Sequence, residues 1–197
     1  KQDVAPQVPE ALHSLPHGSA PNRLALARWL VARDNPLAAR VAVNRHWQAL
    51  FGLGLVRTTE DFGMQGQPPT HPGLLDWLAV EFMDSGWSIK RLHRLMVTSA
   101  TYRQSSATSA AARERDPENE FLTRGPRKRM DAELIRDVVL SVSGQLSTKI
   151  GGPSVFPPQP PGITENSYGP LPWNVSPGED RYRRGLYTFS KRTAPYA

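Results

Sequence analysis

Cysteine is absent from the 197 residues of this sequence. Its absence excludes a disulfide, a thiolate nucleophile, a cysteine zinc site and an iron–sulfur cluster from the chain. It also excludes covalent haem attachment through a CxxCH motif. A chain without cysteine suits reducing and oxidising compartments equally, so this feature does not indicate where the protein resides.

Long apolar runs are absent as well. No stretch approaches the roughly 18 apolar residues of a membrane-spanning helix, because Arg, Asp or His interrupts the longest ones. The first residues show no charged segment followed by an apolar one, so we expect no signal peptide within this fragment. The chain begins at Lys1 rather than Met and stops at Ala197 after a strand-like stretch. We therefore expect a piece of a longer protein.

The motifs of common catalytic families are missing too. There is no GxSxG, Walker or dinucleotide-binding pattern, and the five histidines lack HExxH or HxH spacing, so we predict no metal site. Four catalytic candidates lie in or shortly after a glycine-rich connection at 52–69. They are Glu60, Asp61, His71 and Asp76.

These candidates suggest two chemistries and a structural alternative. Glu60 or Asp61, paired with Asp76 or Glu81, would supply the two carboxylates of glycoside hydrolysis. Asp61, His71 and Asp76 would supply oxygen and nitrogen ligands to a metal ion. Alternatively, the acidic residues cap the loop or pair with nearby arginines, and His71 starts a helix. The distance between the two carboxylates decides whether they can perform glycoside hydrolysis, and the sequence does not give that distance.

Positive charge is concentrated in the second half of the chain. Residues 1–85 carry 7 basic and 8 acidic side chains, whereas residues 86–197 carry 17 and 10, a balance of −1 against +7. Arginine binds carboxylate and phosphate through a planar fork. Arg127, Lys128 and Arg129 are therefore candidate ligand-binding residues for nucleic acid or an anionic surface polymer. Pairing with carboxylates of the same chain is the alternative.

Apolar periodicity and capping signals predict a mainly α fold, with about five helices in an irregular bundle. Pro36 after Asn35 is a strong helix start, and Gly52 is a stop. Gly54 and the glycines at 63 and 66 predict turns with positive φ. Residues 104–128 are expected to form a loop or a short helix. The five predicted helices span 22–33, 35–51, 70–84, 88–102 and 131–146.

The last predicted helix carries five apolar residues at helical spacing, which we expect to face inward. They are Leu134, Ile135, Val138, Val139 and Val142. The predicted organisation has three parts. Residues 1–21 form a linker or extended lead-in, 22–150 a helical domain, and 151–197 a Pro/Gly-rich loop and a strand that continue beyond the fragment.

Prolines recur between residues 151 and 178, so no regular element can persist there. The alternation at 182–191 predicts a short C-terminal strand. In the loop, Trp173 and nearby Tyr168 are candidate ligand-binding residues, because an aromatic ring could stack on a sugar or dock a partner. The alternative is that Trp173 anchors the loop onto the helices.

Six segments together carry a family resemblance. They read NPLAARVAVNRHWQALFGLGLVRTTEDFG at 35–63, HPGLLDWLAVEF at 71–82, GWSIKRLHRLMVTSATYRQSS at 86–106, RMDAELIRDVVLSVSGQL at 129–146, GGPSV at 151–155 and RRGLYTFSKRT at 183–193. In this order they resemble a planctomycete-specific domain of unknown function, numbered fifteen fifty-three in its series. The resemblance covers about residues 22–193.

The resemblance implies in which kind of protein this domain occurs, but not which reaction it performs. Similar domains lie in the C-terminal part of large exported proteins, often after a cytochrome-c-like module, and have no established activity or catalytic residues. The resemblance implies export to the periplasm or cell surface, and partners that are other domains of the same parent chain. We expect no cofactor in this chain, and any haem on another domain of the parent.

Three functions are consistent with these observations. The first, which is not enzymatic, is a structural or interaction module of an exported, cytochrome-c-associated multidomain protein. It predicts an exposed apolar patch near 182–189. The second is a polysaccharide-binding or polysaccharide-degrading domain that uses the 57–71 loop and the 151–178 segment. The third is nucleic-acid binding through the basic C-terminal half, against which the expected export argues.

Overall fold

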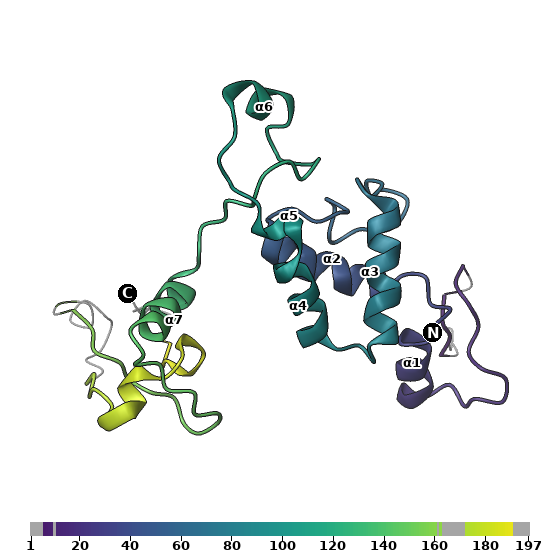
Figure 1. Ribbon diagram of the computed structural model, residues 1–197. Helices are drawn as coiled ribbons and strands as arrows, with labels where there is room; N and C mark the ends of the chain where they lie inside the picture. Colours follow the sequence, from purple (N-terminus) through teal and green to yellow (C-terminus); the bar gives the residue numbers. More distant parts are fainter. Residues whose placement is uncertain (1–5, 10, 161, 163–171, 191–197) are drawn as a thin grey trace. The chain divides into compact units, whose positions relative to one another are not determined.

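The computed structural model describes residues 6–9, 11–160, 162 and 172–190. These residues form seven α-helices and two 3₁₀ helices, and their β-pairing is limited to two isolated bridges. The predicted mainly α class is therefore confirmed. No helix of the described part has the length and apolarity to cross a membrane. The chain divides into two compact units, residues 1–128 and residues 129–197 (Figure 1).

The first unit contains six of the α-helices. They are α1 (Arg23–Leu30), α2 (Ala38–Phe51), α3 (Pro72–Asp84), α4 (Ile89–Thr98), α5 (Ala100–Arg103) and α6 (Ala110–Arg115). The predicted helix at 88–102 is divided at Ser99, whose hydroxyl accepts a hydrogen bond from the Tyr102 N–H and thereby caps α5. The short helix expected within 104–128 is α6.

Asparagine caps explain where the first two helices begin. The side-chain oxygen of Asn22 accepts from the Ala25 N–H at 2.9 Å and so starts α1. The oxygen of Asn35 accepts from the N–H groups of Leu37 and Ala38, both at 3.0 Å, just before α2. These bonds satisfy donors that a helix start otherwise leaves unpaired.

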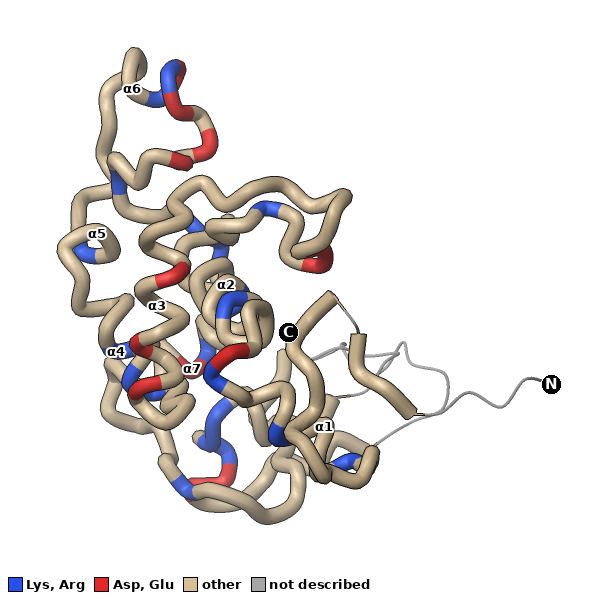
Figure 2. The backbone as a smooth tube through the Cα atoms, turned by 90° about the vertical axis from the view of Figure 1, so that its right-hand side faces the viewer, with Lys and Arg blue, Asp and Glu red and all other residues tan. Residues whose placement is uncertain are grey.

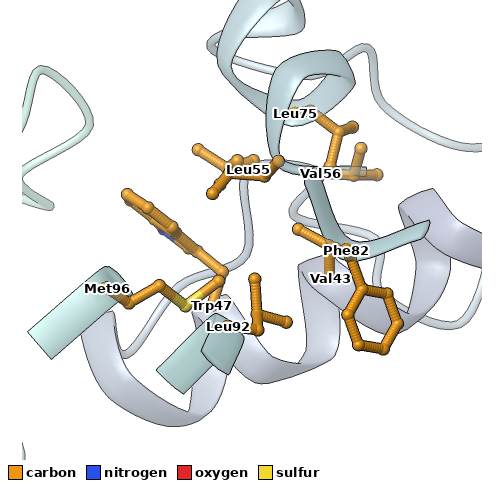
Figure 3. Packing of buried hydrophobic residues seen from close by; sticks show 9 residues of the cluster. Val43, Trp47, Leu55, Val56, Leu75, Phe82, Leu92 and Met96 are labelled. Atoms are coloured by element: carbon orange, nitrogen blue, oxygen red, sulfur yellow. The ribbon is translucent and has the colours of Figure 1, made fainter. Parts of the chain in front are cut away.

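The core of the first unit lies between α2, α3, α4 and the connection that follows α2 (Figure 3). Trp47 stacks on Phe51 with ring centroids 3.8 Å apart. The connection contributes two buried residues of its own, Leu55 and Val56. The buried cluster consists of Val43, Trp47, Leu55, Val56, Leu75, Leu78, Phe82, Leu92 and Met96.

One buried amide holds that connection against α2. Asn44 is fully buried, and its side chain accepts from the Val56 N–H and donates to the Val56 carbonyl, both at 2.9 Å. Gly54 passes so close that a Cβ there would lie 2.7 Å from Asn44 Nδ2. The prediction of positive φ at Gly54 and at the glycines 63 and 66 was wrong. At Gly54, close approach to Asn44 requires the glycine instead.

The second unit contains α7 (Ala132–Val142) and the 3₁₀ helices η1 (Gly178–Tyr182) and η2 (Gly185–Tyr187). The strand predicted at 182–191 was wrong over its described residues, which form parts of η1 and η2 and two isolated bridges. The reason is tertiary: the Gly185 N–H donates to Asp137 of α7 at 2.6 Å rather than to a neighbouring strand. The boundary between the units places α7 with the Pro/Gly-rich segment, whereas composition alone divides the chain at 150.

Arg183 lies at the centre of the second unit, with 1% of its surface exposed. Its guanidinium donates to the carbonyls of Lys149, Gly151 and Pro153, and it stacks 3.9 Å from the centroid of the Tyr187 ring. Such a ring attracts a cation electrostatically. Arg183 therefore holds the Pro/Gly-rich chain onto η2.

Candidate functional site

Two of the four catalytic candidates are paired with arginines. A Glu60 carboxylate oxygen lies 3.6 Å from a guanidinium nitrogen of Arg45, in an exposed pair. Asp76 accepts a hydrogen bond from Nε of Arg40 at 2.6 Å, which joins α3 to α2. Such ion pairs are what the alternative to catalysis predicts, namely that the acidic residues pair with nearby arginines.

The other two candidates make local hydrogen bonds. Asp61 accepts from the Gly63 N–H at 2.7 Å, and this contact closes a tight turn. Nδ1 of His71 lies 3.0 Å from the Thr70 hydroxyl at the start of α3. A cleft of about 680 Å³ runs beside this loop, and Asp76 is the one candidate among its lining residues. Within the described ranges, no three His, Asp or Glu residues are grouped to bind a metal.

Trp173 lies in an aromatic cluster of the second unit. Its indole N–H donates to the Pro157 carbonyl at 2.7 Å, and its ring centroid lies 5.0 Å from that of Phe156 and 6.3 Å from that of Phe189. The ring therefore anchors the Pro/Gly-rich segment on itself. The second aromatic candidate, Tyr168, lies outside the described residues.

The predicted basic cluster is divided between different roles. The Lys128 ammonium donates to the Ala49 carbonyl at 3.1 Å, near the C-terminal end of α2, where a helix favours positive charge. Arg127 is exposed and lines a cleft of the first unit, and Arg129 is exposed at the start of the second.

The polar side of α7 faces the interior of its own unit. Its Asp137 accepts from the Gly185 N–H, and its Arg136 donates to the carbonyls of Arg183 at 2.6 Å and Arg181 at 2.7 Å. Charged side chains on this helix thus satisfy backbone groups of η1, η2 and the link between them. Buried backbone groups need such partners, because a lost hydrogen bond there is costly.

The apolar side of α7 consequently faces away from its unit. Five residues of this face are 44–81% exposed, and the expectation that they point inward was wrong. In a typical surface helix the apolar stripe covers the core, whereas in α7 the polar side does so and the apolar side is exposed. We call these residues the α7 face. They are Leu134, Ile135, Val138, Val139 and Val142.

A comparison with family models identifies the family. The family model described as PSD1, Protein of unknown function (DUF1553), matches residues 22–197. The chain belongs to this family. The predicted resemblance is thereby confirmed, while the family description assigns no activity. No curated protein and no solved structure matches the chain.

This DUF1553 domain also contains a histidine pair that sequence spacing did not reveal, because its members are 47 residues apart. Nε2 of His93 on α4 lies 3.0 Å from Nδ1 of His46 on α2. Burial and the nearby charge of His93 lower the pKa of His46. A positive charge on His93 at this distance makes protonation of His46 less favourable.

We expect the first unit of the DUF1553 domain to lose stability as the pH falls from about 7 to 5. The pKa of His46 is lowered from its ordinary value of 6.5. Below that value His46 binds a proton in the unfolded chain that it resists in the native one. Above it His46 is neutral in both states, and the contribution vanishes. Urea midpoints of the first unit, measured across this range, test the expectation.

The matched variants are His46→Gln and, as a control, His17→Gln at an exposed position. Replacing His46 should flatten the pH dependence, while replacing His17 should leave it unchanged. Identical pH profiles for the parent and His46→Gln would show that the pair is not the cause.

Proposed function

We propose that this domain is a non-catalytic interaction module of an exported multidomain protein, and that it docks onto another domain of the same parent chain through the α7 face. The exposed apolar side of α7 carries the proposal. Export and the neighbouring cytochrome-c-like module rest on the resemblance. The first of the three candidate functions is thus the one that the geometry favours.

Energetics favour a covered α7 face. Burying one Leu, Ile or Val side chain completely contributes about 1.5–3 kcal/mol, and five such residues lie together on one side of α7. The face contains no charged residue, whereas Arg136 and Asp137 are engaged on the opposite side. Contiguous apolar surface of this kind is typical of a protein-binding site.

The spacing on α7 indicates the kind of surface that fits. Leu134, Val138 and Val142 form one ridge at intervals of four, and Ile135 and Val139 form a second. Ridges of this type fit into the grooves of another helix. The complementary surface is therefore an apolar helix, or a pair of helices, on the partner domain.

Area favours a linked partner over a second free copy of the chain. A stable interface buries roughly 800 Å² on each partner, and α7 offers one face of an 11-residue helix. Linkage within one polypeptide raises the effective concentration of a partner to the millimolar range. A small face can then remain occupied.

A charge placed on the α7 face should uncover it in the full-length parent. We expect Val138→Asp to speed amide hydrogen exchange in α7 and in the covering segment at least tenfold, because an unpaired carboxylate opposes burial. The isolated chain should tolerate the change, since Val138 is 44% exposed there. Hydrogen exchange followed by mass spectrometry measures both.

Ser141→Asp is the matched control, because it adds the same charge to the same helix outside the α7 face. It should leave the amide exchange rates of α7 and of the covering segment close to those of the unaltered parent protein. Unchanged protection in Val138→Asp would contradict the proposal. A concentration-dependent dimer of the chain that Val138→Asp dissociates would instead show that a second copy covers the face.

A further inference from the structure

A separate feature of the first unit is a cleft of about 410 Å³ beside the C-terminal end of α2. We call it the arginine cleft, because three arginines line it. Arg113 comes from α6, while Arg124 and Arg127 come from the segment that follows. Phe51, Gly52 and Leu53 also line it.

The arginine cleft has an excess of positive charge. Glu118 is the acidic residue among its lining residues, and this carboxylate already binds Arg57. The side chains of Arg113 and Arg127 make no hydrogen bond or ion pair with any residue that the structure describes. Figure 2 shows acidic and basic positions following one another around α6. Among the described residues, these two guanidiniums are therefore available to a ligand.

Specific hydrogen bonds hold the third arginine of the cleft in place. Asn119, at a φ of 60°, accepts from the Arg124 N–H at 3.2 Å and donates to the Arg124 carbonyl at 2.8 Å. One guanidinium nitrogen of Arg124 donates to the Pro117 carbonyl at 2.8 Å, and the other, Nη1, is buried without a described partner. Because the protein encloses Nη1, Arg124 contributes positive charge to the cleft, whereas the exposed Arg113 and Arg127 offer their N–H groups to a ligand.

The loop that carries Arg124 is fixed at its start as well. Asp116 is buried, and its two oxygens accept from the N–H groups of Glu120 at 2.7 Å and Phe121 at 3.0 Å. Leu122 has a φ of 54°, a conformation that bulky residues rarely adopt. Such a backbone conformation persists only where surrounding contacts hold it, and the hydrogen bonds of Asp116 and Asn119 are contacts of this kind.

We propose that the arginine cleft binds a small organic ligand through the ligand's carboxylate or sulfate group. Both groups are oxyanions that arginine binds through two parallel hydrogen bonds. The volume fits a small ligand, whereas single-stranded nucleic acid follows an extended groove with stacking rings. Phe51 does not offer such a ring, because it stacks on Trp47. This proposal is independent of the α7 face.

Isothermal titration calorimetry at low salt tests the proposal. The probes are a uronate-containing disaccharide, a sulfated disaccharide, a neutral disaccharide, inorganic sulfate and a single-stranded oligonucleotide. We expect one or both acidic disaccharides to bind, and to bind more tightly than inorganic sulfate, while the neutral one does not. Which of the two acidic disaccharides binds shows whether the cleft recognises a carboxylate or a sulfate group.

Arg113→Gln combined with Arg127→Gln should weaken this binding at least tenfold. Arg113→Lys should lose part of it, since lysine keeps the charge without the planar fork. The matched control, Arg115→Gln, removes a charge from the same helix at a residue outside the cleft lining. Equal melting temperatures of all variants would show that folding is intact.

Three outcomes would overturn the proposal. In the first, the double variant binds the acidic disaccharides as the parent does. In the second, inorganic sulfate binds as tightly as the disaccharides, which would indicate a general anion site. In the third, the oligonucleotide alone binds, which would make the cleft part of a nucleic-acid surface.

Discussion

Replacing Asn44 with alanine is expected to lower the unfolding free energy of the first unit by about 3–5 kcal/mol, because a buried polar group that loses its partner costs about 1–3 kcal/mol. Here two such groups, the Val56 N–H and carbonyl, lose their partner at once. Val56 is itself buried, so water does not readily replace the amide. Urea unfolding of the full chain, with hydrogen exchange of residues 38–56, measures the loss.

Two further variants separate the hydrogen bonds from the packing at this position. Asn44→Asp keeps an acceptor for the Val56 N–H but places a charge in the core, so it should be at least as damaging as alanine. Arg45→Ala, one residue along α2, removes only an exposed pair with Glu60. It should change stability by less than about 1 kcal/mol. Similar losses for Asn44→Ala and Arg45→Ala would refute this role of Asn44.

Replacing Arg183 with alanine is expected to destabilise the second unit by about 3 kcal/mol or more. The change opens a cavity at a fully buried side chain and removes the donors from three carbonyls of the 149–153 segment. It also removes the cation that lies over Tyr187. Amide hydrogen exchange resolves the effect, which should be confined to peptides from residues 129–190.

Conservative and neighbouring variants test whether geometry or charge matters at Arg183. Lysine keeps the charge but cannot reach three carbonyls through a planar fork, so Arg183→Lys should recover only part of the stability. Arg184→Ala removes an adjacent, more exposed arginine that lies 3.7 Å from Asp137. Its expected effect is below about 1 kcal/mol. An equal effect of the Arg183 and Arg184 changes would overturn the assignment.

The helices of the first unit were predictable because their signals are local. Asn22 and Asn35 act as caps within three residues of the N–H groups that they bind, and Gly52 ends α2 with a φ of 93°. Apolar spacing also identified the helix at 131–146. In each case the decisive interaction lies within one or two helical turns, so the sequence contains it directly.

The side of a helix that faces the interior was predictable only where the core is large. On α2 the apolar residues Val43 and Trp47, four apart, are buried, as their helical spacing indicates. On α7 the same reasoning failed, because η1 and η2 present backbone N–H and carbonyl groups that require polar partners. Periodicity shows that a helix has an apolar and a polar face. The groups that the rest of the chain presents decide which of these two faces packs against the interior.

The candidate site follows the same division. The acidic candidates Glu60, Asp61 and Asp76 were found by residue type, and the structure places each in an ion pair or a turn. The arginine cleft combines Arg113 with Arg124, eleven residues apart, and with α2, some sixty residues earlier in the chain. No sequence spacing encodes such a combination, because the folded loop between them creates it.

By itself, the sequence determined the helical class, the positions of the main helices, the family and the absence of thiol chemistry. These depend on residue type and on contacts between near neighbours. The tertiary structure alone decided that Asn44 and Arg183 are buried, that His46 meets His93, and that α7 turns its apolar face outward. Each of these depends on which distant backbone or side-chain groups need a partner, and only the folded chain brings those groups together.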